Sequence, residues 1–180
     1  FLHTASLIHD DVVDNTFQRR SGFSVKALWN NKTAILVGDY FLSKSAMLSA
    51  VIKNRNITKL LADLACDLSV GELMQMSNEE MLIIDESAYY EVIKKKTAVT
   101  FACCTSAGAI STDADQELTD HLYNFGEYLG MIFQIKDDIL GIFEEEAKTG
   151  KSSTTDLEEN KKTLLLWHTY QYSSAENKKL

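Results

Sequence analysis

The amino-acid sequence predicts an all-α protein, and three observations support that fold class. The 180 residues include no proline and only eight glycines, so few positions interrupt a helix. Apolar residues make up 45% of the chain and recur at steps of three and four over long stretches, which is the period of an amphipathic helix. No stretch alternates apolar and polar residues for long enough to predict a strand. The length indicates one domain, which we expect to span residues 1–180.

The first half of the chain predicts three helices. Residues 1–14 are apolar and end in acidic residues, and the polar residues 15–22 predict a turn or loop. The strongly apolar residues 32–51 include many small side chains, which suits a closely packed core helix. The polar residues 53–56 predict a break, and residues 58–76 then show the amphipathic period of a second long helix.

The second half continues the helical pattern as far as Phe143. Residues 87–109 predict a further helix, with Ser87 as its N-cap. Asp113 or Asp115 would cap the next helix, which runs towards Phe143.

Two features near the ends concern completeness and function. Residues 144–160 are charged, lack apolar periodicity and predict a loop long enough to suggest a functional role. Residues 163–170 begin another helix. The chain opens at Phe1 directly in an apolar helical pattern and stops at Leu180 soon after another one. We therefore expect the domain to be incomplete at both ends.

Charge and cysteine usage exclude some functions. The net charge of −8 argues against general nucleic-acid binding, which needs a basic surface. No uninterrupted apolar run approaches the roughly 18 residues of a membrane span, so no transmembrane segment is expected. Cys66, Cys103 and Cys104 show no metal-binding spacing and are interpreted as buried free thiols in a reducing compartment. We expect a cytoplasmic protein.

The first acidic cluster is Asp10-Asp11-Val12-Val13-Asp14. On a helix, Asp10 and Asp14 lie one turn apart on the same face and repel each other unless a cation sits between them. Carboxylate oxygens suit Mg²⁺, which usually also contacts substrate phosphates. The cluster therefore predicts a metal site, and the competing interpretation is a solvated acidic helix end.

A second acidic pair, Asp137-Asp138, also follows an apolar stretch. If the two clusters faced each other across a cavity, they could form a multi-metal clamp for a phosphorylated substrate. Basic residues lie near these motifs in the sequence: Arg19, Arg20, Lys94, Lys95, Lys96 and, in the long loop, Lys151. Each alone is more often a surface charge, but together they match what a diphosphate needs.

At this point the sequence resembles the trans-isoprenyl diphosphate synthases (polyprenyl synthetases), of the medium- or long-chain type that includes octaprenyl diphosphate synthases. Six ordered elements carry the resemblance. They are Asp10-Asp11-Val12-Val13-Asp14; Arg19-Arg20-Ser21-Gly22; residues 31–40; Gly71-Glu72-Leu73-Met74-Gln75; Lys96-Thr97-Ala98; and Phe133-Gln134-Ile135-Lys136-Asp137-Asp138 with the loop residues that follow. One departure is Gly141, which stands where the third acid of the second motif is usual. The family's N-terminal element for the homoallylic substrate is also missing.

The resemblance implies an all-α bundle around a deep central cavity, assembled as a homodimer. It implies successive trans 1′–4 condensation of isopentenyl diphosphate onto an allylic diphosphate, helped by several Mg²⁺ ions. By resemblance the metal-binding acids are Asp10, Asp11, Asp14, Asp137 and Asp138, with Asp11 and Asp138 in supporting roles. The implied diphosphate-binding residues are His3, Arg19, Arg20, Lys96, Lys151 and Lys161. Thr97 and Gln134 would turn oxygen atoms towards the allylic carbocation. A lipid product would bring the protein near membranes.

Product length is partly predictable. Ser6 lies four residues before Asp10, hence one turn away on the same helical face, and Ala5 adjoins it. Short-chain members of the family commonly carry bulky aromatic residues at these positions. The small residues here predict an open tunnel and a product of six or more isoprene units.

Two other functions compete with this hypothesis. A non-catalytic or weakened subunit of a heteromeric synthase is suggested by Gly141 alone. A terpene cyclase would use a similar bundle and similar acids, but Arg19-Arg20 and Lys96-Thr97 fit chain elongation better.

Overall fold

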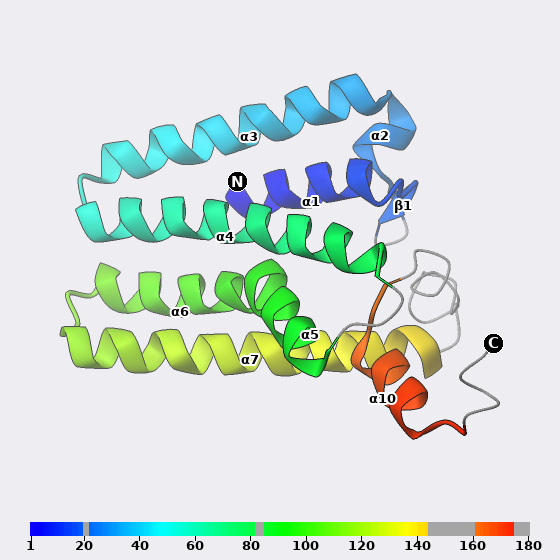
Figure 1. Ribbon diagram of the computed structural model, residues 1–180. Helices are drawn as coiled ribbons and strands as arrows, with labels where there is room; N and C mark the ends of the chain where they lie inside the picture. Colours follow the sequence, from blue (N-terminus) through cyan, green and yellow to red (C-terminus); the bar gives the residue numbers. More distant parts are fainter. Residues whose placement is uncertain (20–21, 82–84, 144–160, 175–180) are drawn as a thin grey trace.

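The computed structural model describes residues 1–19, 22–81, 85–143 and 161–174. Long helices run side by side through the bundle (Figure 1), and the only strands in these residues form a short antiparallel ribbon, which confirms the all-α prediction. The elements are α1 (Leu2–Val13), β1 (Gln18–Arg19), β2 (Gly22–Phe23), α2 (Val25–Leu28), α3 (Asn31–Ile52), α4 (Arg55–Glu79), α5 (Glu86–Ile93), the π-helix η1 (Lys94–Ala98), α6 (Val99–Ser111), α7 (Gln116–Phe143) and α10 (Leu164–Tyr172).

Three helices of the first half, α1, α3 and α4, form where the periodicity predicts them. The break between α3 and α4 has a clear local cause. Lys53 ends α3 in the left-handed conformation, with φ 56°. The Asn54 side chain then caps α4 by accepting hydrogen bonds from the backbone N–H groups of Asn56 and Ile57.

The helix expected over residues 87–109 is corrected in two ways. It consists of α5, the five-residue π-helix η1 and α6, and its N-cap is Asp85 instead of Ser87. Of the two caps considered for α7, Asp115 accepts a hydrogen bond from the Leu118 N–H at 2.8 Å. The ribbon and α2 are too short to give a periodic signal, and the sequence did not predict them.

Helix α7 packs very closely against α6 and η1. A Cβ added to Gly130 would lie 2.5 Å from the Cα of Ala98, closer than two such atoms can approach. Ala98 and Ala102, on the facing side, are fully buried. Small residues therefore allow the two backbones to approach closely. This contact fixes the position of η1 along the axis of α7.

Buried apolar side chains form two clusters. Leu64 of α4 packs with Val99 and Cys103 of α6, and Leu2 of α1 lies against them. Tyr89 and Ile93 of α5 form the second cluster.

The cysteines differ from expectation. Cys103 is buried, but the prediction of buried thiols is wrong for Cys66 and Cys104, which are exposed. All three thiols are free, and Cys66 and Cys104 reach the surface because nothing in the described residues packs over them.

Helix α3 exposes a long apolar stripe. Leu36 is 67% exposed, Tyr40 58% and Val51 70%. Among the described residues this helix alone is long and apolar enough to cross a membrane, by length and composition. Uninterrupted apolar runs are short here, as expected, because Asp39 and Lys44 lie within the helix. Its other side packs along α1, where a Cβ on Gly38 would collide with the His9 ring.

Candidate functional site

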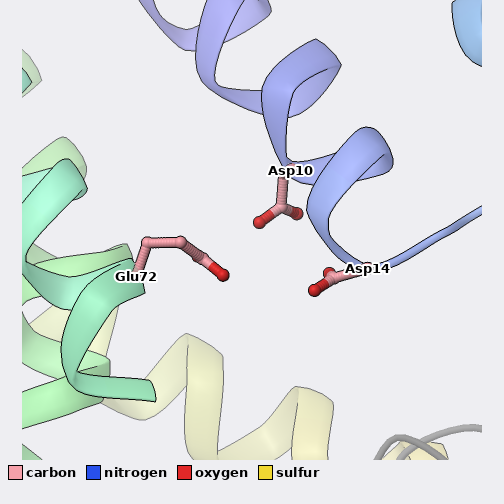
Figure 2. Close-up of side chains that lie close together, drawn as sticks. All are labelled: Asp10, Asp14 and Glu72. Atoms are coloured by element: carbon pink, nitrogen blue, oxygen red, sulfur yellow. The ribbon is translucent and has the colours of Figure 1, made fainter. Parts of the chain in front are cut away.

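Three carboxylates, from the C-terminal end of α1 and from α4, point towards one another (Figure 2). Asp10 lies in the last turn of α1, Asp14 is the C-cap residue of that helix, and Glu72 comes from α4. One oxygen from each lies within 4.8 Å of the others, close enough to share one metal ion. Asp10 and Asp14 thus share a face, as their spacing predicts, and Glu72 is the third member of a group that we call the carboxylate cluster.

Crowding and burial make this cluster electrostatically unfavourable without a cation. Burial, and after it the neighbouring charge of Asp10, raises the pKa of Asp14 from 3.8 to about 6. Burial also raises the pKa of Glu72, against the lowering effect of Lys96. Within the described residues, Oε1 of Glu72 is buried without a hydrogen-bond partner. Hard oxygen ligands, one of them unsatisfied, fit a divalent cation such as Mg²⁺.

Lys96 is the main cationic partner of the cluster. Its Nζ lies 2.7 Å from Glu72 Oε2 and 3.1 Å from Asp10 Oδ1, and it donates a hydrogen bond to Gln75 Oε1 at 3.0 Å. Burial lowers the pKa of Lys96, but Asp10, Glu72 and Asp14 outweigh that effect and raise it above its usual value. The ammonium group therefore stays charged at the centre of the site.

The three consecutive lysines of the π-helix η1 pair with different acids. Lys94 pairs with Glu127 at 2.9 Å and Lys95 with Asp67 at 2.7 Å, whereas Lys96 reaches the carboxylate cluster. The wider turn is accommodated by Gly71 of α4, where an added Cβ would lie 2.7 Å from the Lys96 backbone nitrogen. This close approach holds Lys96 beside Glu72, one residue further along α4.

The arginine motif is only partly described. Arg19 Nε donates to Asp11 Oδ1 at 2.8 Å, and its Nη2 lies 3.4 Å from Asp10 Oδ2. Asp11 is 3% exposed and is not a member of the carboxylate cluster. Asp11 accepts from the guanidinium of Arg19, which also lies beside Asp10.

The structure describes only some of the other predicted diphosphate ligands. Arg20 and Lys151 lie outside the described residues, as does the loop expected over residues 144–160. Lys161 is close enough to lower the pKa of Asp14. His3 is exposed on α1, two turns before Asp10.

The second acidic motif lies near the C-terminal end of α7, at the end of the bundle where α1 and α4 also finish (Figure 1). Asp137 is exposed, and Asp138 is 9% exposed. Asp137 is not part of the carboxylate cluster formed by α1 and α4. Gln134 Nε2 donates to Asp138 Oδ1 at 2.8 Å, and Thr97 Oγ1 donates to Gln134 Oε1 at 2.7 Å.

The two residues assigned to chain length differ in exposure. Ala5 is 2% exposed, and Ser6 is half-buried and donates a hydrogen bond to the His3 carbonyl at 2.9 Å. Leu2, Ser6 and Asp10 follow one another at four-residue steps on α1. Ser6 therefore stands between the acidic end of α1 and the apolar cluster around Leu64.

Sequence reasoning did not assign a role to two residues of this region. Glu72 was noticed only as part of a motif, although an acid on the buried face of an amphipathic helix was an available signal. Tyr89 donates a hydrogen bond to Asp138 Oδ2 at 2.6 Å, and the two residues are 49 positions apart. Nothing in a single sequence indicates that contact.

The profile of the polyprenyl synthetase family matches residues 1–180. Octaprenyl diphosphate synthase of Haemophilus influenzae is 35% identical, over 98% of this chain and 54% of its own length. Geranylgeranyl diphosphate synthase of Saccharolobus solfataricus is 35% identical, over 99% of this chain and 56% of its own length. Heptaprenyl diphosphate synthase component 2 of Bacillus subtilis is 34% identical, over 98% and 51%. The chain spans about half the length of these curated relatives.

The helical arrangement also matches solved structures. A polyprenyl synthase from Caulobacter crescentus, complexed with calcium and isoprenyl diphosphate, has a TM-score of 0.94 to this chain at 31% identity. The match covers 99% of this chain and 54% of that one. This structural similarity confirms the expected type of helical bundle.

Proposed function

The chain belongs to the polyprenyl synthetase family, and we propose that the complete protein is a prenyltransferase that condenses isopentenyl diphosphate onto an allylic diphosphate. The observation that carries this proposal is the carboxylate cluster of Asp10, Asp14 and Glu72 with Lys96 beside it. Acidic ligands next to a fixed cation suit a metal-bound diphosphate leaving group.

The difficult step is the departure of diphosphate from the allylic carbon. Mg²⁺ held by Asp10 and Asp14, with Glu72 beside them and Asp137 from α7, would neutralise negative charge on the leaving group. Lys96 and Arg19 add positive charge that does not depend on the metal. Fixed charges stabilise the developing anion without reorganising during the reaction.

Two oxygen-bearing side chains are suited to the other product of ionisation. Thr97 and Gln134 are joined by a 2.7 Å hydrogen bond between η1 and α7, one residue from Lys96. We propose that their remaining lone pairs face the positive allylic carbon. The carbon–carbon bond then forms when the double bond of isopentenyl diphosphate attacks that carbon, and loss of a proton completes the addition of five carbons. We assign removal of the proton to the released diphosphate, so the reaction needs no side chain as a general base.

The product is proposed to contain six or more isoprene units, made by repeated trans condensation. A cavity of about 280 Å³ lies between α4, α6 and α7. It is lined by Leu60, Leu64, Val99 and Cys103, together with Asp63, Cys66, Asp67 and Tyr123. Leu64 is two turns before Glu72 on α4, so a chain growing away from the carboxylate cluster would run towards this apolar region.

Ser6→Phe is expected to shorten the product while the first condensation continues. A phenyl ring at residue 6 would stand between Asp10 and the apolar cluster contacted by Leu2. Ala5→Phe with Ser6→Phe should shorten it further, although Ala5 is nearly fully enclosed, so the unfolding midpoint of that variant must be compared with wild type. Products are sized after dephosphorylation. An unchanged product length in a folded Ser6→Phe variant would reject this placement of the tunnel.

A second candidate is a weakened subunit of a heteromeric synthase. Two observations favour it: Gly141 replaces an acid in the second motif, and a relative is named component 2 of a heptaprenyl diphosphate synthase. Retention of Asp10, Asp14, Arg19 and Lys96 in one region argues for a working site. The two candidates differ in whether the protein alone extends a prenyl chain.

We propose a homodimer as the assembly. Leu36, Tyr40 and Val51 form an exposed apolar stripe on α3. Monomeric proteins rarely expose such a contiguous apolar surface, and a second copy of the chain would bury it. The mass in solution tests this, and Leu36→Glu should shift it towards the monomer. The free thiols support a cytoplasmic location.

The test of the function uses the complete protein with labelled isopentenyl diphosphate, farnesyl diphosphate and Mg²⁺, and a chelated control. We expect a metal-dependent series of products ending at one long chain. Failure to incorporate label with any allylic primer would reject the enzyme and favour the subunit. Restoring an acid by Gly141→Asp would then be the next variant to assay.

A further inference from the structure

We propose that Tyr89 is a positioning residue for this reaction, because its buried phenol fixes Asp138 and thereby sets the orientation of the Gln134 amide towards Thr97. The inference rests on the proposed function and deepens it. It adds a residue from α5, remote in sequence from both acidic motifs, to the groups that determine the rate.

A continuous chain of hydrogen bonds joins three elements. The Tyr89 hydroxyl of α5 donates to Asp138 Oδ2 at 2.6 Å, and Gln134 Nε2 of α7 donates to Asp138 Oδ1 at 2.8 Å. Thr97 Oγ1 of η1 donates to Gln134 Oε1 at 2.7 Å. Both oxygens of the Asp138 carboxylate are therefore engaged, one from another helix and one from its own helix.

The Tyr89 ring is firmly held. It is 3% exposed and forms a core cluster with Ile93, against which Met131, Ile135 and Leu164 pack. The adjacent Tyr90 ring meets it edge-on, with the centroids 5.5 Å apart. Burial and the bond to Asp138 raise the pKa of Tyr89 far above the working range, so its hydroxyl remains a donor.

The direction of the Gln134 amide follows from this arrangement. A carboxylate accepts hydrogen bonds only, so the fixed Asp138 selects the NH₂ side of the amide and leaves the carbonyl side for Thr97. Thr97 then uses its single hydroxyl hydrogen on Gln134. Free lone pairs therefore remain on Thr97 Oγ1 and Gln134 Oε1 for whatever lies beside these two oxygens, while the second amide hydrogen stays on the nitrogen, on the side of Asp138.

This polarity matters for the proposed chemistry. Acceptor atoms stabilise a developing allylic cation, whereas a reversed amide would direct N–H groups at Thr97 and release the threonine hydrogen. Without the phenol, Asp138 loses the hydrogen bond from α5 that helps to fix it, and the amide can turn. Small misplacements of such groups reduce rates strongly.

Tyr89→Phe in the complete protein is the main test, with Tyr90→Phe as the matched control. Tyr90 is the next residue of α5, and its hydroxyl donates to Glu86 at 3.2 Å, away from Asp138. We expect Tyr89→Phe to lower kcat about tenfold and to change KM for isopentenyl diphosphate less than threefold. Tyr90→Phe should leave both constants unchanged.

A double-mutant cycle separates positioning from a purely structural role. In a Gln134→Met background, Tyr89→Phe should cause no further loss of kcat, because the group through which it acts is gone. Equal losses in both backgrounds, or a lowered unfolding midpoint with normal kcat, would overturn the inference. If Tyr89→Phe does not fold, Tyr89→Met, whose flexible apolar side chain fills the core without a hydroxyl, replaces it in the same cycle, with the same expected and contrary results.

The proposed function can fail independently of this inference. A wild-type protein that incorporates no isopentenyl diphosphate rejects the function, whereas an active wild type with an equally active Tyr89→Phe variant rejects only the role of Tyr89. A crystal structure of Tyr89→Phe gives a second readout. There the Gln134 amide should turn and the Thr97 contact lengthen beyond a hydrogen bond.

Discussion

Lys96→Met is expected to lower kcat of the complete protein by about 10²–10³-fold, the loss typical when a fixed charge is removed from a developing anion. Lys96 lies 2.7 Å from Glu72 and 3.1 Å from Asp10, in the position where a diphosphate bound to the same acids would meet its ammonium group. Lys96→Arg keeps the charge and should lose less. Steady-state rates of labelled isopentenyl diphosphate incorporation measure both.

The neighbouring lysine provides the control for this variant. Lys95 lies on the same π-helix but pairs with Asp67 on another side of α4. Lys95→Met therefore disturbs the local helix without removing charge from the carboxylate cluster, and its activity should stay within a few-fold of wild type. Equal losses in Lys95→Met and Lys96→Met would show that the π-helix, and not the Lys96 charge, determines the rate.

A stability effect should accompany the loss of rate. In metal-free protein Lys96 is the only cation in direct contact with Glu72 among the described residues. Removing one member of a part-buried ion pair leaves the partner uncompensated, which destabilises the fold. We expect a lower unfolding midpoint for Lys96→Met in chelator, and partial recovery with Mg²⁺, because the metal can replace the missing positive charge.

The long helices and the pairing of Asp10 with Asp14 could be predicted because both are local. Apolar residues at three- and four-residue steps determine α1, α3 and α4, and a four-residue spacing alone places two acids on one face. The step between Ser6 and Asp10 likewise places Ser6 on the face of Asp10, but the predicted product length also depends on the resemblance to the family.

The π-helix η1 could not be predicted. Its five residues interrupt a stretch whose composition favours an ordinary helix throughout, and the widened turn lies close against Gly71 on another helix. The separate destinations of Lys94, Lys95 and Lys96 follow from that widened turn. A sequence period describes one helix by itself, so it carries no information about such contacts.

Side-chain contacts between residues far apart in the chain could not be predicted from the sequence either. The Tyr89–Asp138 bond joins residues 49 positions apart, and the partner of Asp11 is set by a turn that ends at Arg19. The motif pattern groups Asp10, Asp11 and Asp14 together. The structure separates them, because successive helical residues point about 100° apart. Asp11 consequently meets Arg19, while its neighbours meet Glu72.

Asp14→Asn is expected to make the metal-free protein more stable at pH 7.5 and to lower its activity at least 10²-fold. Burial, and then repulsion by Asp10, raises the pKa of Asp14 from 3.8 to about 6. Between these two values the folded protein holds a proton that the unfolded chain has lost. The stability of the metal-free protein should therefore fall as pH rises from about 4 to 6 and stay lower above pH 6.

Bound Mg²⁺ should reverse this dependence of folding stability on pH. A divalent cation needs the ionised carboxylate, so stabilisation by Mg²⁺ should be large above pH 6 and small near pH 4.5, where a proton occupies Asp14. Without metal, Asp14→Asn should remove the part of the fall in stability that comes from Asp14 and leave the part that comes from Glu72, whose pKa burial also raises. With metal, it should abolish most of the gain. The measurement is the unfolding midpoint from pH 4.5 to 7.5, for wild type and for Asp14→Asn, each with chelator and with Mg²⁺.

Asp63→Asn controls for a general change of charge. Asp63 pairs with Lys59 on the exposed surface of α4, and such pairs contribute little to stability. Its midpoints should follow those of wild type at every pH. If Asp14→Asn were instead less stable than wild type in chelator at pH 7.5, the attraction of Asp14 to Lys96 would outweigh its burial and its repulsion by Asp10. The carboxylate cluster would then be held together by its own lysine, and a metal would be unnecessary to explain its geometry.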